Sequence, residues 1–235
     1  MNTIDILKTL LKHNSAISAL HVVPITQSVF VQNAIETAIV DKNQVEAALS
    51  IRAQHKFSFW DALCSVFIDN PAYSKTLLSN VFHHNYNNEV LLVGSQDFLN
   101  DELRLDKDKS YAATSNVVMK DGRICHIPMV DFHCCVSSTN ESLVYDVALE
   151  LDAGPGFILN SGNSYHFLGT NLIEGDGIYK FMGRMIMFNP IIDKSWVAHQ
   201  MIEGYCALRI TEKNGLMPRV VREIFAADLP NNANL

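Results

Sequence analysis

The chain has 235 residues, of which 48% are hydrophobic and 18% are charged, and its formal net charge is −7. This composition is typical of a soluble globular protein and excludes disorder as the main state. The negative charge disfavours a protein that coats nucleic acid with its whole surface, because such surfaces are rich in Lys and Arg. No apolar run approaches the roughly 18 residues of a membrane span, and neither a secretory signal nor a disulfide framework is evident. We therefore expect a cytoplasmic protein with no membrane partner.

The first 86 residues are predicted to form a helical region. Apolar residues recur at helical spacing after Thr3 and over residues 41–55. Ser58 and Asp61 have the spacing of a capping box ahead of a further apolar stretch. The polar segment 83–88 is expected to be a boundary. The chain is thus divided into a helical region, 1–86, and a second part, 87–235.

Strand signals dominate the second part. Asp121-Gly122 lies between the apolar segments 117–119 and 124–130, which is a strong hairpin signal. Further along, the pattern predicts a helix capped by Ser138 or Thr139 that ends before Gly154. Two strands at 157–159 and 167–168 and a partly helical stretch at 172–203 follow. A last strand pair, 207–211 and 219–225, is turned at Asn214-Gly215. Helices and strands mix without regular alternation, which favours an α+β fold.

Asp131 and His133 close an apolar stretch that begins at Pro128. Because they are two positions apart on a predicted strand, both side chains should leave the same face. A carboxylate and an imidazole placed in this way can share one metal ion or one phosphate. The alternative is that nearby backbone groups satisfy each side chain separately, as in most such pairs.

A polar turn follows, in which Gly162 and Asn163 are turn formers. Ser164 and His166 are again two positions apart and can offer a hydroxyl and an imidazole to an anion. The alternative is a turn whose polar side chains bond only to the backbone.

Asp193 follows an apolar pair and precedes a helix expected to begin near Ser195. It can cap this helix, and capping does not exclude metal binding. Arg209 lies in a strand whose other residues are predicted to be buried, and a buried Arg needs an anionic or hydrogen-bonding partner.

Taken in order, these three segments resemble the motifs of the archaeo-eukaryotic primase superfamily. There, motif one is a strand ending in acid-x-acid, motif two is Ser-x-His on a hairpin, and motif three is an acid after an apolar pair. The matching segments here are 130–133, 164–166 and 192–193. Segments 160–166 and 191–219 are also similar to the polymerase/primase domain of bacterial end-joining ligases, and the resemblance covers about residues 88–225.

The resemblance implies a primase-like core with an antiparallel or mixed sheet, made of an RRM-like half and a second α/β half. It implies a nucleotidyltransferase of DNA replication or repair that joins nucleoside triphosphates on a DNA or RNA template, with or without a partner protein. The implied catalytic residues, which also bind Mg²⁺ or Mn²⁺, are Asp131, His133 and Asp193. The implied nucleotide-binding residues are Ser161, Asn163, Ser164, His166 and Arg209.

One position departs from the family pattern. His133 stands where motif one has its second carboxylate, which removes a negative charge from a site that gathers cations. Imidazole is also a poorer ligand for Mg²⁺ than for Mn²⁺. The sequence therefore does not decide whether the protein is an active enzyme. The alternative is a catalytically inactive module of the same fold that binds nucleotide or nucleic acid as a recruitment or regulatory subunit.

Two other classes are disfavoured. The segment 162–166 begins like a Gly-x-Ser-x-Gly nucleophile elbow but has a histidine in place of the last glycine, which argues against a serine hydrolase. The Cys and His residues at 125–126 and 133–135 contain no Cys-x-x-Cys pair, which argues against a zinc site.

Overall fold

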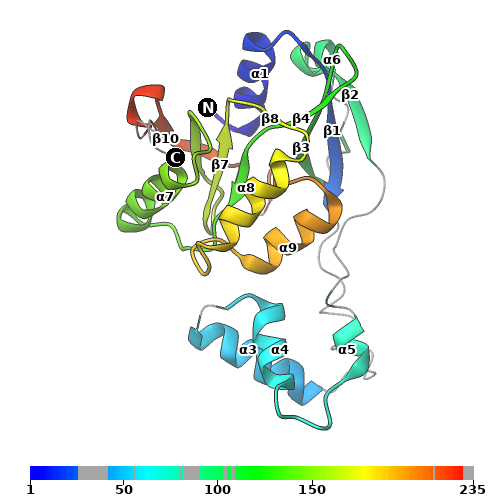
Figure 1. Ribbon diagram of the computed structural model, residues 1–235, viewed down its shortest axis with the longest axis vertical. Coiled ribbons are helices and arrows are strands. Elements are labelled where there is room, and N and C mark those ends of the chain that lie inside the picture. Colours follow the sequence, from blue (N-terminus) through cyan, green and yellow to red (C-terminus); the bar gives the residue numbers. More distant parts are fainter. Residues whose placement is uncertain are drawn as a thin grey trace.

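The computed structural model describes residues 1–25, 42–55, 57–79, 81, 90–102, 105–106, 109–213 and 215–229. Two antiparallel sheets and the helices packed on them form the body, and a smaller helical lobe lies below it (Figure 1). The predicted α+β class is confirmed. Among the described residues, no helix combines the length and the apolar character needed to cross a membrane.

The larger sheet has the strand order β2-β1-β3-β4-β8, and β9 pairs with β3 alongside β4. The predicted hairpin at Asp121-Gly122 joins β3 to β4, and Gly122 has the positive φ of 84° that such a turn requires. The strands are β1 (Ile17–Ile25), β2 (Leu91–Gly94), β3 (Ser110–Met119), β4 (Ile124–His126), β8 (Ile173–Glu174) and β9 (Ala207–Arg209).

The smaller sheet has the order β10-β6-β7-β5, with strands β5 (Met129–Asp131), β6 (Gly156–Asn160), β7 (Tyr165–Gly169) and β10 (Arg219–Ile224). The chain passes between the sheets at Ile127 and Pro128. Ile127 N donates to Ser115 O in the larger sheet, and Gly169 N donates to Pro128 O in the smaller one. Both sheets share one hydrophobic core. The body helices are α1 (Thr3–His13), α6 (Ser95–Leu99), α7 (Ser138–Glu150), α8 (Gly177–Ile186), α9 (Lys194–Glu203) and a 3₁₀ turn, η1 (Ala226–Asp228).

The last predicted strand pair is wrong. β9 pairs with β3 and β10 pairs with β6, so the two strands belong to different sheets. The predicted turn includes Asn214, which lies outside the described residues. A turn signal between two apolar runs fixes a change of direction, but it does not fix the partner of either strand. Here β9 pairs with β3 of the larger sheet, and β10 pairs with β6 of the smaller sheet.

The N-terminal prediction also differs from the structure, because the segment before residue 26 belongs to the body. β1 is an interior strand between β2 and β3, and α1 packs into the main core. The sequence of β1 is rich in β-branched residues, which favour strands. Only α3 (Lys42–His55), α4 (Phe59–Phe67) and α5 (Lys75–Ser79) form the helical lobe, which has a core of its own. The predicted boundary at 83–88 lies outside the described residues.

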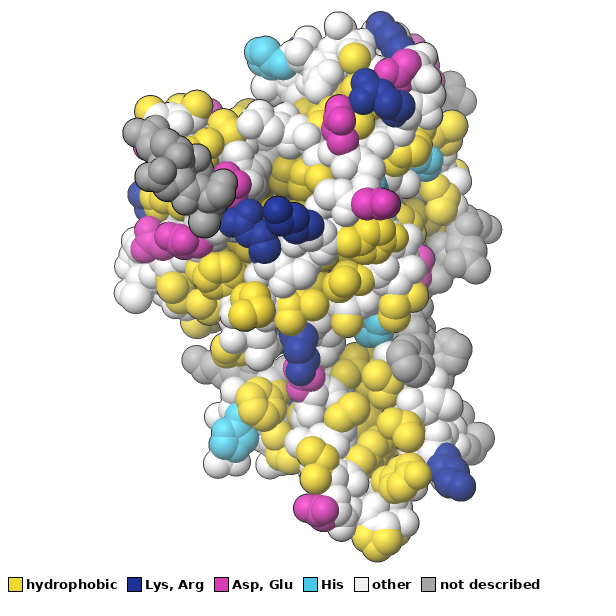
Figure 2. All heavy atoms as spheres, in the orientation of Figure 1, with side chains coloured by type: hydrophobic (Ala, Val, Ile, Leu, Met, Phe, Trp, Pro, Cys, Tyr) yellow, Lys and Arg dark blue, Asp and Glu magenta, His cyan; other side chains and the backbone are white. Residues whose placement is uncertain are grey.

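Three polar contacts join the helical lobe to α9. The hydroxyls of Ser58 and Ser195 lie 2.7 Å apart, and Lys194 Nζ lies 2.9 Å from Asp61 Oδ1. His199 Nε2 lies 2.8 Å from the carbonyl oxygen of residue 81. Ser58 also caps α4 by accepting from the backbone N–H of Asp61, as its spacing predicts. The lobe is therefore fixed to the helix that follows Asp193. Figure 2 shows it as the smaller unit at the bottom, with apolar side chains gathered on the visible face.

A buried histidine in the larger sheet makes folding stability sensitive to acid. Ser115 Oγ accepts from the backbone N–H of Cys206 and lies 3.2 Å from His126 Nδ1, so its own proton is directed to a neutral imidazole. Burial lowers the pKa of His126 below its usual 6.5. Below pH 6.5 the unfolded chain therefore binds a proton at His126 more readily than the folded chain does. The contribution of His126 to the unfolding free energy is lost as the pH falls below 6.5.

We expect His126→Asn to reduce the loss of unfolding free energy between pH 7.5 and pH 5, as measured by urea denaturation. An equal loss in the variant and in the native chain would contradict this assignment. His166, whose pKa is also lowered, is present in both proteins and cancels from the comparison.

Candidate active site

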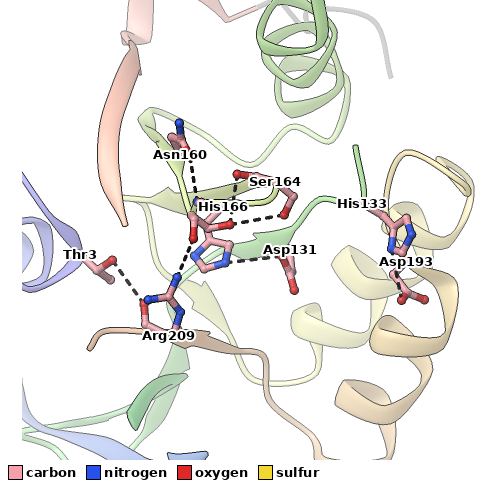
Figure 3. Close-up of polar contacts among 10 residues, drawn as sticks. Thr3, Asp131, His133, Asn160, Ser164, His166, Asp193 and Arg209 are labelled. Atoms are coloured by element: carbon pink, nitrogen blue, oxygen red, sulfur yellow. Dashed lines mark hydrogen bonds and ion pairs between the residues drawn. The ribbon is translucent and has the colours of Figure 1, made fainter. Parts of the chain in front are cut away.

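Asp131 and His166 lie opposite each other at the cleft end of the smaller sheet. Asp131 ends β5, and the strand register pairs it directly with His166 on β7. Directly paired residues project from the same face, and here His166 Nε2 lies 3.5 Å from Asp131 Oδ1 (Figure 3). The acid of motif one and the histidine of motif two thus meet, although 35 positions separate them.

His166 is held as a neutral imidazole. Its side chain is 8% exposed, and burial together with the charge of Arg209 lowers its pKa to about 3. Its Nδ1 is buried and makes no hydrogen bond with the described residues. A buried nitrogen without a partner is uncommon and calls for an explanation, such as a bound group.

Asp131 carries the most perturbed carboxyl group of the site. Its pKa rises to about 7, because of burial and because the carboxylate of Asp193 repels its negative charge. Two carboxylates that disfavour each other's ionisation are stabilised by a cation placed between them. The negative charge of Asp193 therefore acts on the ionisation of Asp131.

Asp193 is brought to the site by a short backbone link. Phe132 and Ile192 form an antiparallel bridge, and His133 N donates to Ile191 O at 2.7 Å. This places His133 Nδ1 3.6 Å from Asp193 Oδ2. The Asp193 carboxylate raises the pKa of His133.

The other oxygen of Asp193 caps α9, as its position before Ser195 predicts. Oδ1 accepts from the backbone N–H groups of Ser195 at 2.8 Å and Trp196 at 3.2 Å. Burial opposes ionisation of Asp193, but the contact with His133 and the two amide donors outweigh it and lower its pKa. Asp193 is thus an ionised carboxylate with one oxygen committed to the helix.

The turn before β7 is built by short-range hydrogen bonds. Gly162 has a φ of 110°, and its N–H donates to Asn160 Oδ1. Ser161 N and Ser161 Oγ both donate to Ser164 O. Ser161 is therefore used within the turn, whereas Asn163 and Ser164 line the cleft.

Arg209 finds its partners in backbone carbonyls. Its NH1 group donates to Thr211 O at 2.6 Å and Leu216 O at 2.7 Å, and its NH2 group donates to Ser161 O at 2.6 Å. Figure 3 shows the guanidinium beside His166 and the motif-two turn. Arg209 therefore ties β9 to this turn and brings a positive charge close to Asp131.

Some of these residues line a cleft of about 700 Å³, whereas His166, Asp193 and Arg209 are not among its lining residues. Its body side includes Asp131, His133, Cys135, Asn163 and Ser164. Its opposite side comes from the helical lobe: Leu49, Arg52, Ala53 and Phe57. Sequence reasoning missed this second wall, because only the folded chain brings the lobe next to the strands.

The predicted ligand set is divided in the structure. Asp131 pairs with His166, and His133 pairs with Asp193, instead of Asp131 and His133 acting from one strand face. β5 ends at Asp131, so His133 lies beyond the strand and the alternation no longer applies. Within the described ranges, no three His, Cys, Asp or Glu side chains are arranged to hold a metal ion. Metal binding stays a prediction.

Comparison with known proteins agrees with the motif assignment. A family model described as archaeo-eukaryotic primase 1D-like matches residues 93–222, which is more than half of the chain. No curated protein and no solved structure matches the chain. The closer likeness to bacterial end-joining ligases stays a prediction. The matched range contains all three motifs, and the chain therefore belongs to the archaeo-eukaryotic primase-like family.

Proposed function

We propose that the protein is a primase/polymerase-like nucleotidyltransferase that joins nucleotides on a DNA or RNA template with the help of a divalent metal ion. The observation that carries the proposal is the contact between Asp131 and His166 beside a cleft that Asp131, His133 and Ser164 line, with Asp193 paired to His133. The carboxyl groups suit a cation, and the neutral imidazole beside them suits the anion that such a cation accompanies.

Asp131 and Asp193 would hold the divalent ion, since carboxylate oxygens are the ligands that Mg²⁺ and Mn²⁺ prefer. Burial raises the pKa of Asp131 and repulsion by the Asp193 carboxylate adds to this rise, and a nearby cation would offset both effects. His133 is the third candidate ligand, and its imidazole favours Mn²⁺ over Mg²⁺. When bound, such an ion neutralises phosphate charge and activates the attacking hydroxyl.

The motif-two turn is placed to hold the triphosphate. Ser164 and Asn163 face the cleft with a hydroxyl and an amide. His166 contributes a neutral ring whose Nδ1 is unused. Arg209 and Ser161 support this wall: Arg209 fixes the turn and supplies positive charge, while the backbone of Ser161 accepts from it.

The proposal is tested by incubating the full chain with a primed template, an unprimed template, all four nucleotides, and Mg²⁺ or Mn²⁺. We expect template-dependent extension, with more product under Mn²⁺ than under Mg²⁺. Absence of product under both ions, with every template, would contradict the enzymatic assignment.

Metal binding has a readout that does not depend on turnover. An ion that binds only the folded chain raises the unfolding free energy, by about 2.7 kcal/mol at a hundredfold excess over the dissociation constant. We expect Mn²⁺ to raise the melting temperature of the native chain and to have little effect on Asp131→Asn. An equal rise in both proteins would place the ion elsewhere.

The second candidate is a module that binds nucleotide without catalysis. It is favoured by His133 in place of a carboxylate and by the division of the ligands into two pairs. Nucleotide binding that depends on Ser164 and persists without any product would support this module.

A further inference from the structure

The cleft wall formed by the helical lobe has its own chemical character. Leu49, Arg52 and Ala53 share one face of α3, at the spacing i, i+3, i+4, and Phe57 follows the helix. The buried residues of α3, such as Val45, come earlier in the helix and pack in the lobe core. In the C-terminal part of α3, Ile51 still packs against that core, while Arg52 and Ala53 border the cleft.

This wall combines an exposed aromatic ring with an unpaired cation. Phe57 is 40% exposed. Arg52 is the only Lys or Arg among the described residues that line the cleft, and it forms no ion pair with any described residue. Its charge opposes the protonation of His133, so its field reaches the opposite wall.

The wall is also held in place relative to the catalytic acids. Ser58, next to Phe57 in sequence, meets the hydroxyl of Ser195 at 2.7 Å. The backbone N–H of Ser195 in turn donates to Asp193 Oδ1. One short chain of hydrogen bonds therefore links the helical lobe to the acid of motif three.

The chemistry of this wall matches a single-stranded nucleic acid. A guanidinium pairs with backbone phosphate, and a neighbouring aromatic ring stacks on a base, which is how single strands are bound without sequence preference. The wall with Asn163 and Ser164 is assigned to the triphosphate, which leaves the lobe wall for the second substrate of a templated reaction.

We propose that the helical lobe is the strand-binding wall of the cleft, where Arg52 pairs with a phosphate of single-stranded nucleic acid and Phe57 stacks on an adjacent base. This inference rests on the proposed function in one respect, which is that the nucleotide binds to the opposite wall of the cleft. It assigns a role to a segment that lies outside the family match at residues 93–222.

The test measures binding of a fluorescein-labelled, mixed-sequence single strand to the full chain by anisotropy, without metal or nucleotide, over a series of salt concentrations. DNA and RNA strands are used in parallel to identify the preferred sugar. Each phosphate contact contributes about −0.7 to the slope of log K against log salt for single strands. We expect Arg52→Ala to reduce the slope by about this amount, and Phe57→Leu to weaken binding by roughly fivefold or more at an unchanged slope.

Matched controls separate these effects from general changes in charge or apolar surface. Lys42→Ala removes a positive charge from the same helix, where Lys42 is exposed and pairs with Glu46. Phe225→Leu removes another exposed aromatic ring, 57% exposed, outside the cleft. Both controls should leave strand affinity and salt slope within error of the native chain.

The outcomes distinguish this inference from the proposed function. Loss of strand binding in the Arg52 and Phe57 variants supports it, even if no nucleotide is ever incorporated. Variants indistinguishable from their controls would overturn it, as would a native chain that binds neither strand. Weaker nucleoside triphosphate binding in Arg52→Ala, with unchanged strand binding, would also overturn it and assign Arg52 to the nucleotide.

Discussion

Asp131→Asn and Asp193→Asn are each expected to lower nucleotide incorporation by at least about a hundredfold, which corresponds to about 2.7 kcal/mol of transition-state stabilisation. Asn keeps the shape of each side chain but removes the negative charge that would hold a divalent ion. Burial raises the pKa of Asp131 and the charge of Asp193 adds to this rise, so each negative charge is expected to matter for holding a cation. The measurement is the rate of primer extension under Mn²⁺.

Asparagine is the informative replacement at Asp193 because of the helix cap. Its side-chain oxygen can still accept from the N–H groups of Ser195 and Trp196, and Asn caps helices about as well as Asp. Asp193→Ala would remove both functions and confuse misfolding with lost activity. Asp121→Asn, at an exposed ion pair with Arg123, is the matched control and should retain full activity. Activity unchanged in either site variant would remove that acid from the mechanism.

Arg209→Lys is expected to lower the unfolding free energy by about 2–3 kcal/mol. The variant would leave part-buried carbonyl oxygens, such as those of Thr211 and Ser161, without their charged hydrogen-bond donor. The guanidinium reaches Ser161, Thr211 and Leu216 at once from one planar group. A single ammonium group on a more flexible stem cannot reproduce this fork. Urea denaturation of the native and variant chains measures the difference.

The same variant separates two roles of Arg209. If it fixes the motif-two turn, Arg209→Lys weakens triphosphate binding together with stability, although the positive charge is retained. A variant with native stability and native nucleotide affinity would show that neither the fork nor its geometry matters. Arg222→Lys is the control. Arg222 belongs to β10, its guanidinium lies over the ring of Tyr145, and it is not among the residues that line the cleft.

The sequence is informative where a short-range rule decides the structure. The hairpin at Asp121-Gly122 and the caps at Ser58 and Asp193 depend on neighbouring residues and are confirmed. The α+β class follows from the mixed pattern of helices and strands in the same way. The motif order indicates the family, and the family model confirms it.

The sequence is less informative where partners come from distant segments. The strands at 207–209 and 219–224 form no hairpin, because each pairs with a distant strand and the two partners belong to different sheets. Residues 17–25 became an interior strand that a helical interpretation of the first third overlooked. Asp131 and His133 likewise separate, since the strand ends between them and each imidazole–carboxylate contact crosses the fold.

The lobe wall illustrates the same limit at the site itself. Arg52 and Phe57 carry no motif, and they precede Asp131 by more than 70 positions. The docking of the helical lobe on α9, through contacts such as Ser58 with Ser195, brings them to the cleft that the motif-two turn also lines. Residues of this kind are visible from coordinates, while a single sequence shows only an exposed helix.

The most direct measurement is anomalous X-ray scattering from a crystal of the chain soaked with Mn²⁺ and a non-hydrolysable nucleoside triphosphate. A manganese peak within about 2.5 Å of carboxylate oxygens from both residue 131 and residue 193, with phosphate oxygens next to Ser164 and to His166 of β7, is the expected result. Manganese bound elsewhere, or a triphosphate lodged away from that strand, would refute the assignment of this cleft.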